Sequence, residues 1–115
     1  MKAKTTTGLA ILVAFSLVAA LSAGAARQQP DAGRKVYERE KCATCHQIAK
    51  RGNSRYPLDG VASRLTSDKI RRWLTHPAEM EAALSRMPAL RMSTMKYRLN
   101  RQELDALVAY LETLK

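Results

Sequence analysis

Apolar residues divide the chain into an N-terminal apolar run and a longer part in which they recur with helical spacing. The run is LAILVAFSLVAAL, from Leu9 to Leu21, and it contains no charged residue. At the other end, apolar residues recur at steps of three and four, at Leu104, Leu107, Val108, Leu111 and Leu114. Asn100 precedes Glu103 by three residues, which is a variant of the capping box. We therefore predict an amphipathic helix that begins near Asn100.

Two shorter helices are predicted upstream of it. Asp31 is a candidate N-cap for a helix over residues 32–41, in which Val36 and Tyr37 are the apolar positions. Thr66 or Ser67 can cap a helix over residues 68–75 that ends before His76-Pro77, because proline disfavours helical backbone in the residue before it.

A further short helix is plausible over residues 78–84, and no segment after the apolar run alternates as a strand should. The predicted fold is therefore all-α, with three main helices plus a short helix and loops.

Residues 1–26 have the order of a secretory signal peptide. Lys2 and Lys4 precede the apolar run, and the small residues SAGAA follow it. Cleavage after Ala25 or after Ala26 fits this pattern. An uncleaved anchor helix is the alternative, since residues 9–26 could just span a hydrocarbon core of about 30 Å. We expect export to the periplasm, with residues 27–115 forming the domain.

The exported part is small and basic. After removal of residues 1–26 it has 89 residues, and it loses two of the 20 Lys and Arg and none of the ten Asp and Glu, so its net charge is +8. A chain of this length usually needs a disulfide, a metal or a cofactor besides its apolar core. The charge favours acidic protein surfaces, anionic lipid or nucleic acid. Export argues against nucleic acid, and a membrane partner is expected only if the leader is retained.

Both cysteines and one of the two histidines lie within five residues, as Cys42, Cys45 and His46. A disulfide would close a very small loop and stabilise little. A redox dithiol expects a preceding strand, which the sequence lacks, and zinc would have only His76 as a fourth ligand. Cys-x-x-Cys-His is the spacing of covalent haem attachment, with two thioether bonds and an adjacent imidazole for the iron. Haem would also supply buried apolar surface.

The chain resembles the class I cytochrome c family, bacterial exported type, over most of residues 27–115. The resemblance rests on CATCH and on three further segments, DAGRKVYEREK, YPLDGVASRLT and LNRQELDALVAYLETLK. It implies a small helical fold around one covalent haem c, and transfer of single electrons rather than catalysis. Gly33 resembles the glycine at which the first and last helices of the family cross closely.

The resemblance also suggests residues around the haem. Pro57 resembles the proline whose carbonyl accepts a hydrogen bond from the iron-bound imidazole. Trp73 is expected to pack against haem, with its indole N–H available to a propionate, and Tyr110 matches the family's AYL sequence. A simple loop proline and ordinary core aromatics are the alternatives.

For the second iron ligand the family usually supplies a methionine from the loop before the last helix. Met92 is preferred because it lies 18 positions before Tyr110, although Ser93 follows it where the family more often has proline. Met87, in Met87-Pro88-Ala89, and Met95 are the alternatives. His76 is expected at the surface or as a helix cap.

With both axial positions filled by protein, the site suits an electron carrier. Basic residues near the motif can attract an acidic redox partner, namely Arg39, Lys41, Lys50, Arg51 and Arg55. The rival functions are a cytochrome subunit of an exported dehydrogenase or oxidase, a haem enzyme or sensor with an open sixth position, and a haem-free basic binding module.

Overall fold

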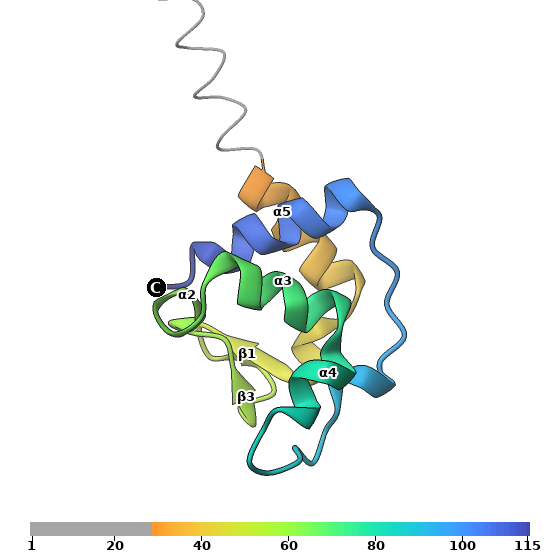
Figure 1. The fold of residues 1–115 in the computed structure, drawn as a ribbon. Coiled ribbons are helices and arrows are strands. Elements are labelled where there is room, and N and C mark those ends of the chain that lie inside the picture. The colour runs from red at the N-terminus through yellow and green to blue at the C-terminus, as the bar shows by residue number, and fades with distance from the viewer. Residues whose placement is uncertain (1–28) are drawn as a thin grey trace, which may run out of the picture.

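The computed structural model describes residues 29–115, and helices make up most of this part (Figure 1). The predicted leader, residues 1–26, lies outside the described residues. A helix over residues 29–39 is followed by η1 (Cys42–Thr44), β1 (His46–Ile48), β2 (Arg51–Gly52), β3 (Tyr56–Pro57), α2 (Val61–Arg64), α3 (Ser67–Thr75), α4 (Pro77–Ala82), η2 (Met92–Thr94) and α5 (Arg101–Glu112).

All the predicted helices are present, and α2 is a further short helix that was not predicted. The capping box at the start of α5 is complete, since Asn100 Oδ1 accepts from the Glu103 N–H at 2.9 Å and the Glu103 carboxylate accepts from the Asn100 N–H at 3.0 Å. The Thr66 side chain caps α3. Asp31 is not an N-cap, because the described part of the first helix already includes residues 29 and 30.

The expectation of no strand was wrong, because β1, β2 and β3 form a small sheet. β1 pairs antiparallel with β2 and parallel with β3. Strands of two or three residues are too short to show alternation. The turn between β1 and β2 also has an unusual sequence, because Ala49 and Lys50 both take positive φ, where Asn-Gly is the common choice. The all-α class still describes the protein, since the sheet is a minor element.

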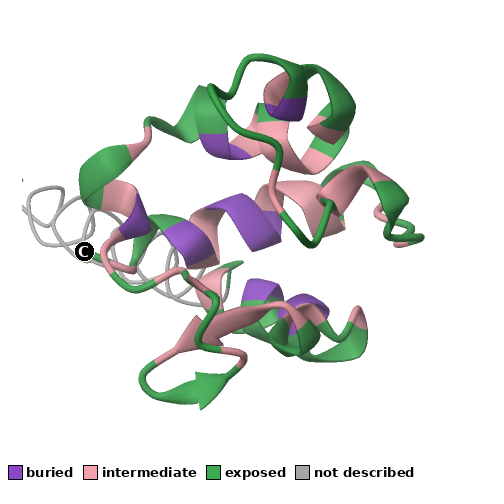
Figure 2. Cartoon of the chain, turned by 90° about the horizontal axis from the view of Figure 1, so that it is seen from below, coloured by how far each residue is buried: buried purple, intermediate pink, exposed green. Residues whose placement is uncertain are grey.

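The core lies where the helix over residues 29–39, α3 and α5 come together. Figure 2 shows that the buried residues face the inside of the molecule while the outer faces of the helices are exposed. The apolar core residues are Val36, Tyr37, Val61, Ile70, Ala106, Leu107, Val108 and Leu111.

The first helix and α5 cross at Gly33 (Figure 1). A Cβ atom at this position would lie 1.9 Å from the carbonyl oxygen of Ala106 and 2.6 Å from the Cβ of Tyr110. Backbone atoms cannot rotate away, so only glycine permits this approach. The packing role expected for Gly33 is confirmed.

Gly33→Ala should lower the free energy of unfolding by about 2 kcal/mol, because overpacking of a backbone contact costs more than the roughly 1 kcal/mol that Ala gains over Gly in a helix. Denaturant titration of the haem-loaded protein measures this change. Lys35→Ala, on the exposed face of the same helix, is the control and should change stability little. Equal stability of Gly33→Ala and the parent would contradict the close crossing.

Candidate functional site

A cavity of about 550 Å³ lies between the helices, and its lining also includes residues of the small sheet and of η2. This is within the usual range of small-molecule and cofactor pockets. Its walls are mainly apolar and include core side chains from three elements, namely Val61 of α2, Ile70 of α3, and Leu107 and Leu111 of α5. The core is therefore built around this cavity.

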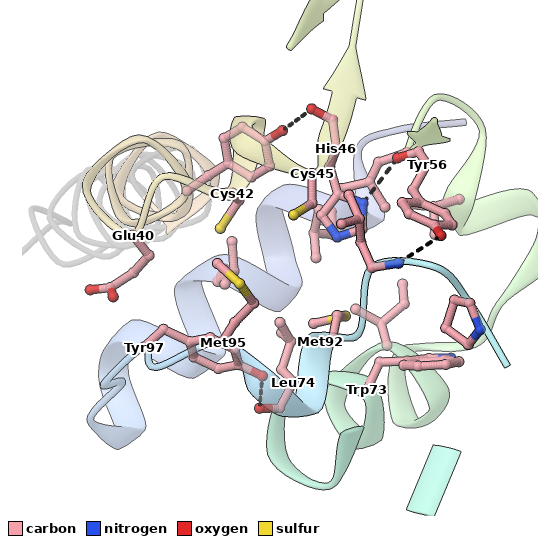
Figure 3. A pocket seen from close by; sticks show the side chains of 18 of the residues that line it. Glu40, Cys42, Cys45, His46, Tyr56, Trp73, Leu74, Met92, Met95 and Tyr97 are labelled. Carbon is pink, nitrogen blue, oxygen red and sulfur yellow. Dashed lines mark hydrogen bonds between the residues drawn. The ribbon is translucent and has the colours of Figure 1, made fainter. Parts of the chain in front are cut away.

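Cys42 and Cys45 lie on one wall of the cavity (Figure 3). Both are half-buried free thiols, and η1 brings them together, with the Cys45 N–H donating to the Cys42 carbonyl at 3.1 Å. Burial raises the pKa of the Cys42 thiol to about 11. A reactive C-x-x-C dithiol needs a lowered pKa in one of its cysteines. The Cys42 thiol is therefore not the activated member that a redox dithiol needs.

His46 begins β1, and its ring is oriented by a backbone carbonyl. The parallel pairing of His46 with Tyr56 brings the Tyr56 carbonyl oxygen within 2.9 Å of Nδ1. Because a carbonyl only accepts, Nδ1 carries the proton and Nε2 has a free lone pair. Burial lowers the pKa of His46, against the effect of the bond to Tyr56. The ring is therefore kept neutral, with Nε2 available as an iron ligand.

The carbonyl that orients His46 belongs to Tyr56 and not to Pro57, so the expectation for Pro57 was wrong. In the parallel register, Pro57 pairs with Gln47 and its carbonyl lies 3.5 Å from Nη2 of Arg64, which donates to it. The loop sequence does not reveal which of two consecutive carbonyls faces the ring. The interaction itself was anticipated, but it comes one residue earlier.

Met92 and Met95 lie across the cavity from the two cysteines and His46 (Figure 3). Met92 starts η2 and is half-buried, whereas Met95 follows η2 and is 44% exposed. Met87 is 51% exposed and does not line the cavity. Of the three candidate methionines, two are therefore at the site.

Of the two aromatic residues expected near haem, only Trp73 lines the cavity. Tyr110 was placed wrongly, because it faces the first helix, where its ring meets that of Tyr37 edge-on with centroids 6.0 Å apart. Tyr37, not Tyr110, reaches the cavity, and its hydroxyl donates to the His46 carbonyl at 3.3 Å. His76 is exposed, with Nδ1 beside the Thr75 hydroxyl at 2.7 Å, as a surface histidine should be.

The side chains around the cavity fit a haem c group. Two unpaired thiols and a neutral imidazole share one wall, thioether sulfurs lie on the other side, and the remaining lining is mostly apolar. A zinc site fits less well, since residues 29–115 contain no group of three or more His, Cys, Asp and Glu that could hold a metal ion.

The sequence matches the family described as Cytochrome c over residues 30–115, which is most of the chain. The chain belongs to the cytochrome c family. Neither the curated proteins nor the solved structures include a match to it. Membership means that the protein carries covalently attached haem c, for which Cys42 and Cys45 have the right spacing, and that it is a haem-binding electron carrier.

Two residues of this cytochrome site were not found from the sequence. Tyr56 supplies the carbonyl for His46, and its hydroxyl accepts from the Leu90 N–H at 3.2 Å, so it links the His46 side of the cavity to the methionine segment. Glu81 is a buried acid on α4 that also lines the cavity. No sequence signal indicates Tyr56, because its role depends on the parallel register of β1 and β3. The sequence Ala-Glu-Met-Glu-Ala around Glu81 gives no sign that one of its two acids is buried.

Replacing both Cys42 and Cys45 by Ala should abolish covalent haem, because no sulfur remains for a thioether bond. Haem staining of a denaturing gel measures this in protein produced with the cytochrome maturation machinery. Thr44→Ala, between the two cysteines, is the control and should stain like the parent. Staining of the double variant would show that haem is attached elsewhere.

Proposed function

We propose that the protein is an exported monohaem electron carrier in which His46 and Met92 would hold the haem iron. The observation that carries the proposal is that His46 and Met92 line opposite sides of one cavity whose lining also contains both cysteines. Bound haem c supplies an iron that accepts and releases single electrons. With one imidazole and one thioether from the protein, no position is left for a substrate.

Each ligand has a distinct role. His46 presents Nε2 because Nδ1 is engaged with the Tyr56 carbonyl, which fixes both the tautomer and the orientation of the ring. Met92 offers a neutral thioether, and His/Met ligation raises the potential relative to two histidines. The two cysteines fix the cofactor at the wall that holds His46.

Met92 is favoured over its neighbours by its place in the chain. It lies 18 positions before Tyr110, and it starts a turn that is closed by the Met95 N–H donating to the Met92 carbonyl at 3.0 Å. Met87 is on the exposed loop. Met95 is the second candidate because it too lines the cavity.

Export to the periplasm is supported by the composition of residues 1–26 and by the cytochrome c family, whose domains typically act outside the cytoplasm. Among residues 29–115, none of the helices has the length and apolar character needed to cross a bilayer.

An acidic redox protein is the proposed partner. Lys50, Arg51 and Arg55 are exposed in and after the β1–β2 turn, which follows directly from the Cys-x-x-Cys-His segment, and no ion pair engages them within residues 29–115. Arg39 differs, because it pairs with Glu40 and Glu103 and its charge is compensated. The attractive surface is therefore centred on the turn, and its effect should weaken with salt.

Met92→Ala should remove the weak long-wavelength band by which sulfur-to-ferric-iron charge transfer reports thioether ligation. It should also lower the reduction potential, because the sulfur favours the reduced iron. Absorption spectroscopy of the oxidised protein and a redox titration measure the two effects. Met95→Ala is the matched control and should keep the band. If Met95→Ala loses it instead, Met95 is the ligand. If both variants keep the band, another methionine such as Met87 is the ligand, and a parent protein without the band has no methionine ligand.

Replacing Lys50 and Arg51 together by Glu should slow the second-order reaction with an acidic blue-copper protein by roughly tenfold at low salt, because steering of an oppositely charged partner is reversed. Stopped-flow kinetics at increasing salt should bring the variant and the parent together. Replacing Arg98 and Arg101 together by Glu changes the net charge by the same four units near the start of α5 and should have a smaller effect. Equal slowing by both changes would show that only net charge matters.

A further inference from the structure

Glu81 is the one buried polar or charged residue in the part of the chain that the structure describes. Glu81 as a whole is 1% exposed, and its side chain has no exposed surface. Glu79, two residues earlier on α4, has a side chain that is 62% exposed. A buried carboxylate is costly unless it is paired and hydrogen-bonded, so the position of Glu81 calls for compensating partners.

All the compensating partners come from one short segment on either side of Met92. The Glu81 carboxylate accepts from the Ser93 hydroxyl at 2.6 Å, from the Ser93 backbone N–H at 3.0 Å and from Nε of Arg91 at 3.0 Å. The hydrogen bond from the Ser93 hydroxyl, with the other two, lowers the pKa of Glu81 against the effect of burial. The group is therefore an anion at neutral pH.

The bond to the Ser93 N–H replaces a missing helix cap. Arg91 is the N-cap of η2, and no side-chain hydrogen bond caps this turn from its own N-cap residue. First-turn N–H groups have no partner inside a helix, so one must come from elsewhere. Glu81 provides it from α4, and the turn that begins with Met92 is thereby joined to the helical part of the protein.

We propose that Glu81 is a positioning residue for Met92: its carboxylate holds residues 91 and 93 so that the intervening thioether stays at the cavity. This inference rests on the proposed ligation by Met92. A thioether is a weak neutral ligand, and it competes better with outside ligands when its backbone is fixed in advance. Glu81 would therefore set how easily the methionine is displaced.

The test uses imidazole as a competing iron ligand in the oxidised, haem-loaded protein. Glu81→Gln keeps the shape of the side chain but removes the negative charge. It also places an amide NH₂ group next to the hydrogen-bond donors of Arg91 and Ser93. We expect imidazole to bind on the order of tenfold more tightly, as expected for the loss of a charge-assisted hydrogen bond. Glu79→Gln makes the same chemical change on the exposed side of α4 and should leave imidazole binding unchanged.

Two further measurements separate positioning from a general loss of stability. Ser93→Ala removes only the hydroxyl bond and should give a smaller rise in imidazole affinity. Amide hydrogen exchange should become faster at Ser93 in Glu81→Gln, while α5 keeps its protection. Global loosening would accelerate exchange in α5 as well, and that result would overturn a specific role in positioning.

The outcomes also distinguish this inference from the ligand assignment. If Met92→Ala loses the charge-transfer band but Glu81→Gln binds imidazole like Glu79→Gln, Met92 remains the ligand and the role of Glu81 is refuted. If Met92→Ala keeps the band, the ligand assignment fails and the inference about Glu81 fails with it. A tenfold rise confined to Glu81→Gln, with faster exchange at Ser93, supports both.

Discussion

The rest of the structure depends on one constraint: this short chain directs much of its apolar surface toward a shared cavity. Val61, Ile70, Leu107 and Leu111 are buried in the core and also line the cavity. A small domain buries a smaller fraction of its surface than a large one, so a big apolar cofactor adds contacts that the side chains cannot make among themselves. The helices must consequently pack close to one another around the cofactor space. Gly33 permits this at the crossing with α5.

The two sides of the cavity are held by different kinds of interaction. On the His46 side, backbone structure positions the functional groups. The pairing of β1 with β3 places the Tyr56 carbonyl oxygen beside Nδ1 of His46, and η1 fixes the spacing of the two cysteines. On the methionine side the segment between α4 and α5 has only η2 as regular structure. There the contacts are made by side chains, with Glu81 on Ser93 and the Tyr56 hydroxyl on the Leu90 N–H.

The same difference explains what could be predicted from the sequence. Helices have local causes, so the capping box at Asn100 and the apolar spacing of α5 identified that helix within a residue of its start. The Cys-x-x-Cys-His spacing likewise identified the attachment site. The sheet depends on pairing between two-residue and three-residue strands, which leave no periodic pattern. The error at Pro57 has the same origin, because the register of a parallel pair decides between adjacent carbonyls.

Glu81 shows why the methionine side is the harder one to predict. Its sequence neighbours would suit an exposed acidic helix, and its burial follows only from contact with a segment ten to twelve residues further along. That contact has a physical reason. The loop between α4 and α5 has only η2 as regular structure, so few backbone hydrogen bonds of its own fix it. A charged group withdrawn from water and bonded three times in one place gives a directional attachment that apolar contacts lack. With Met92 as the proposed iron ligand, such an attachment would leave little to rearrange when an electron moves.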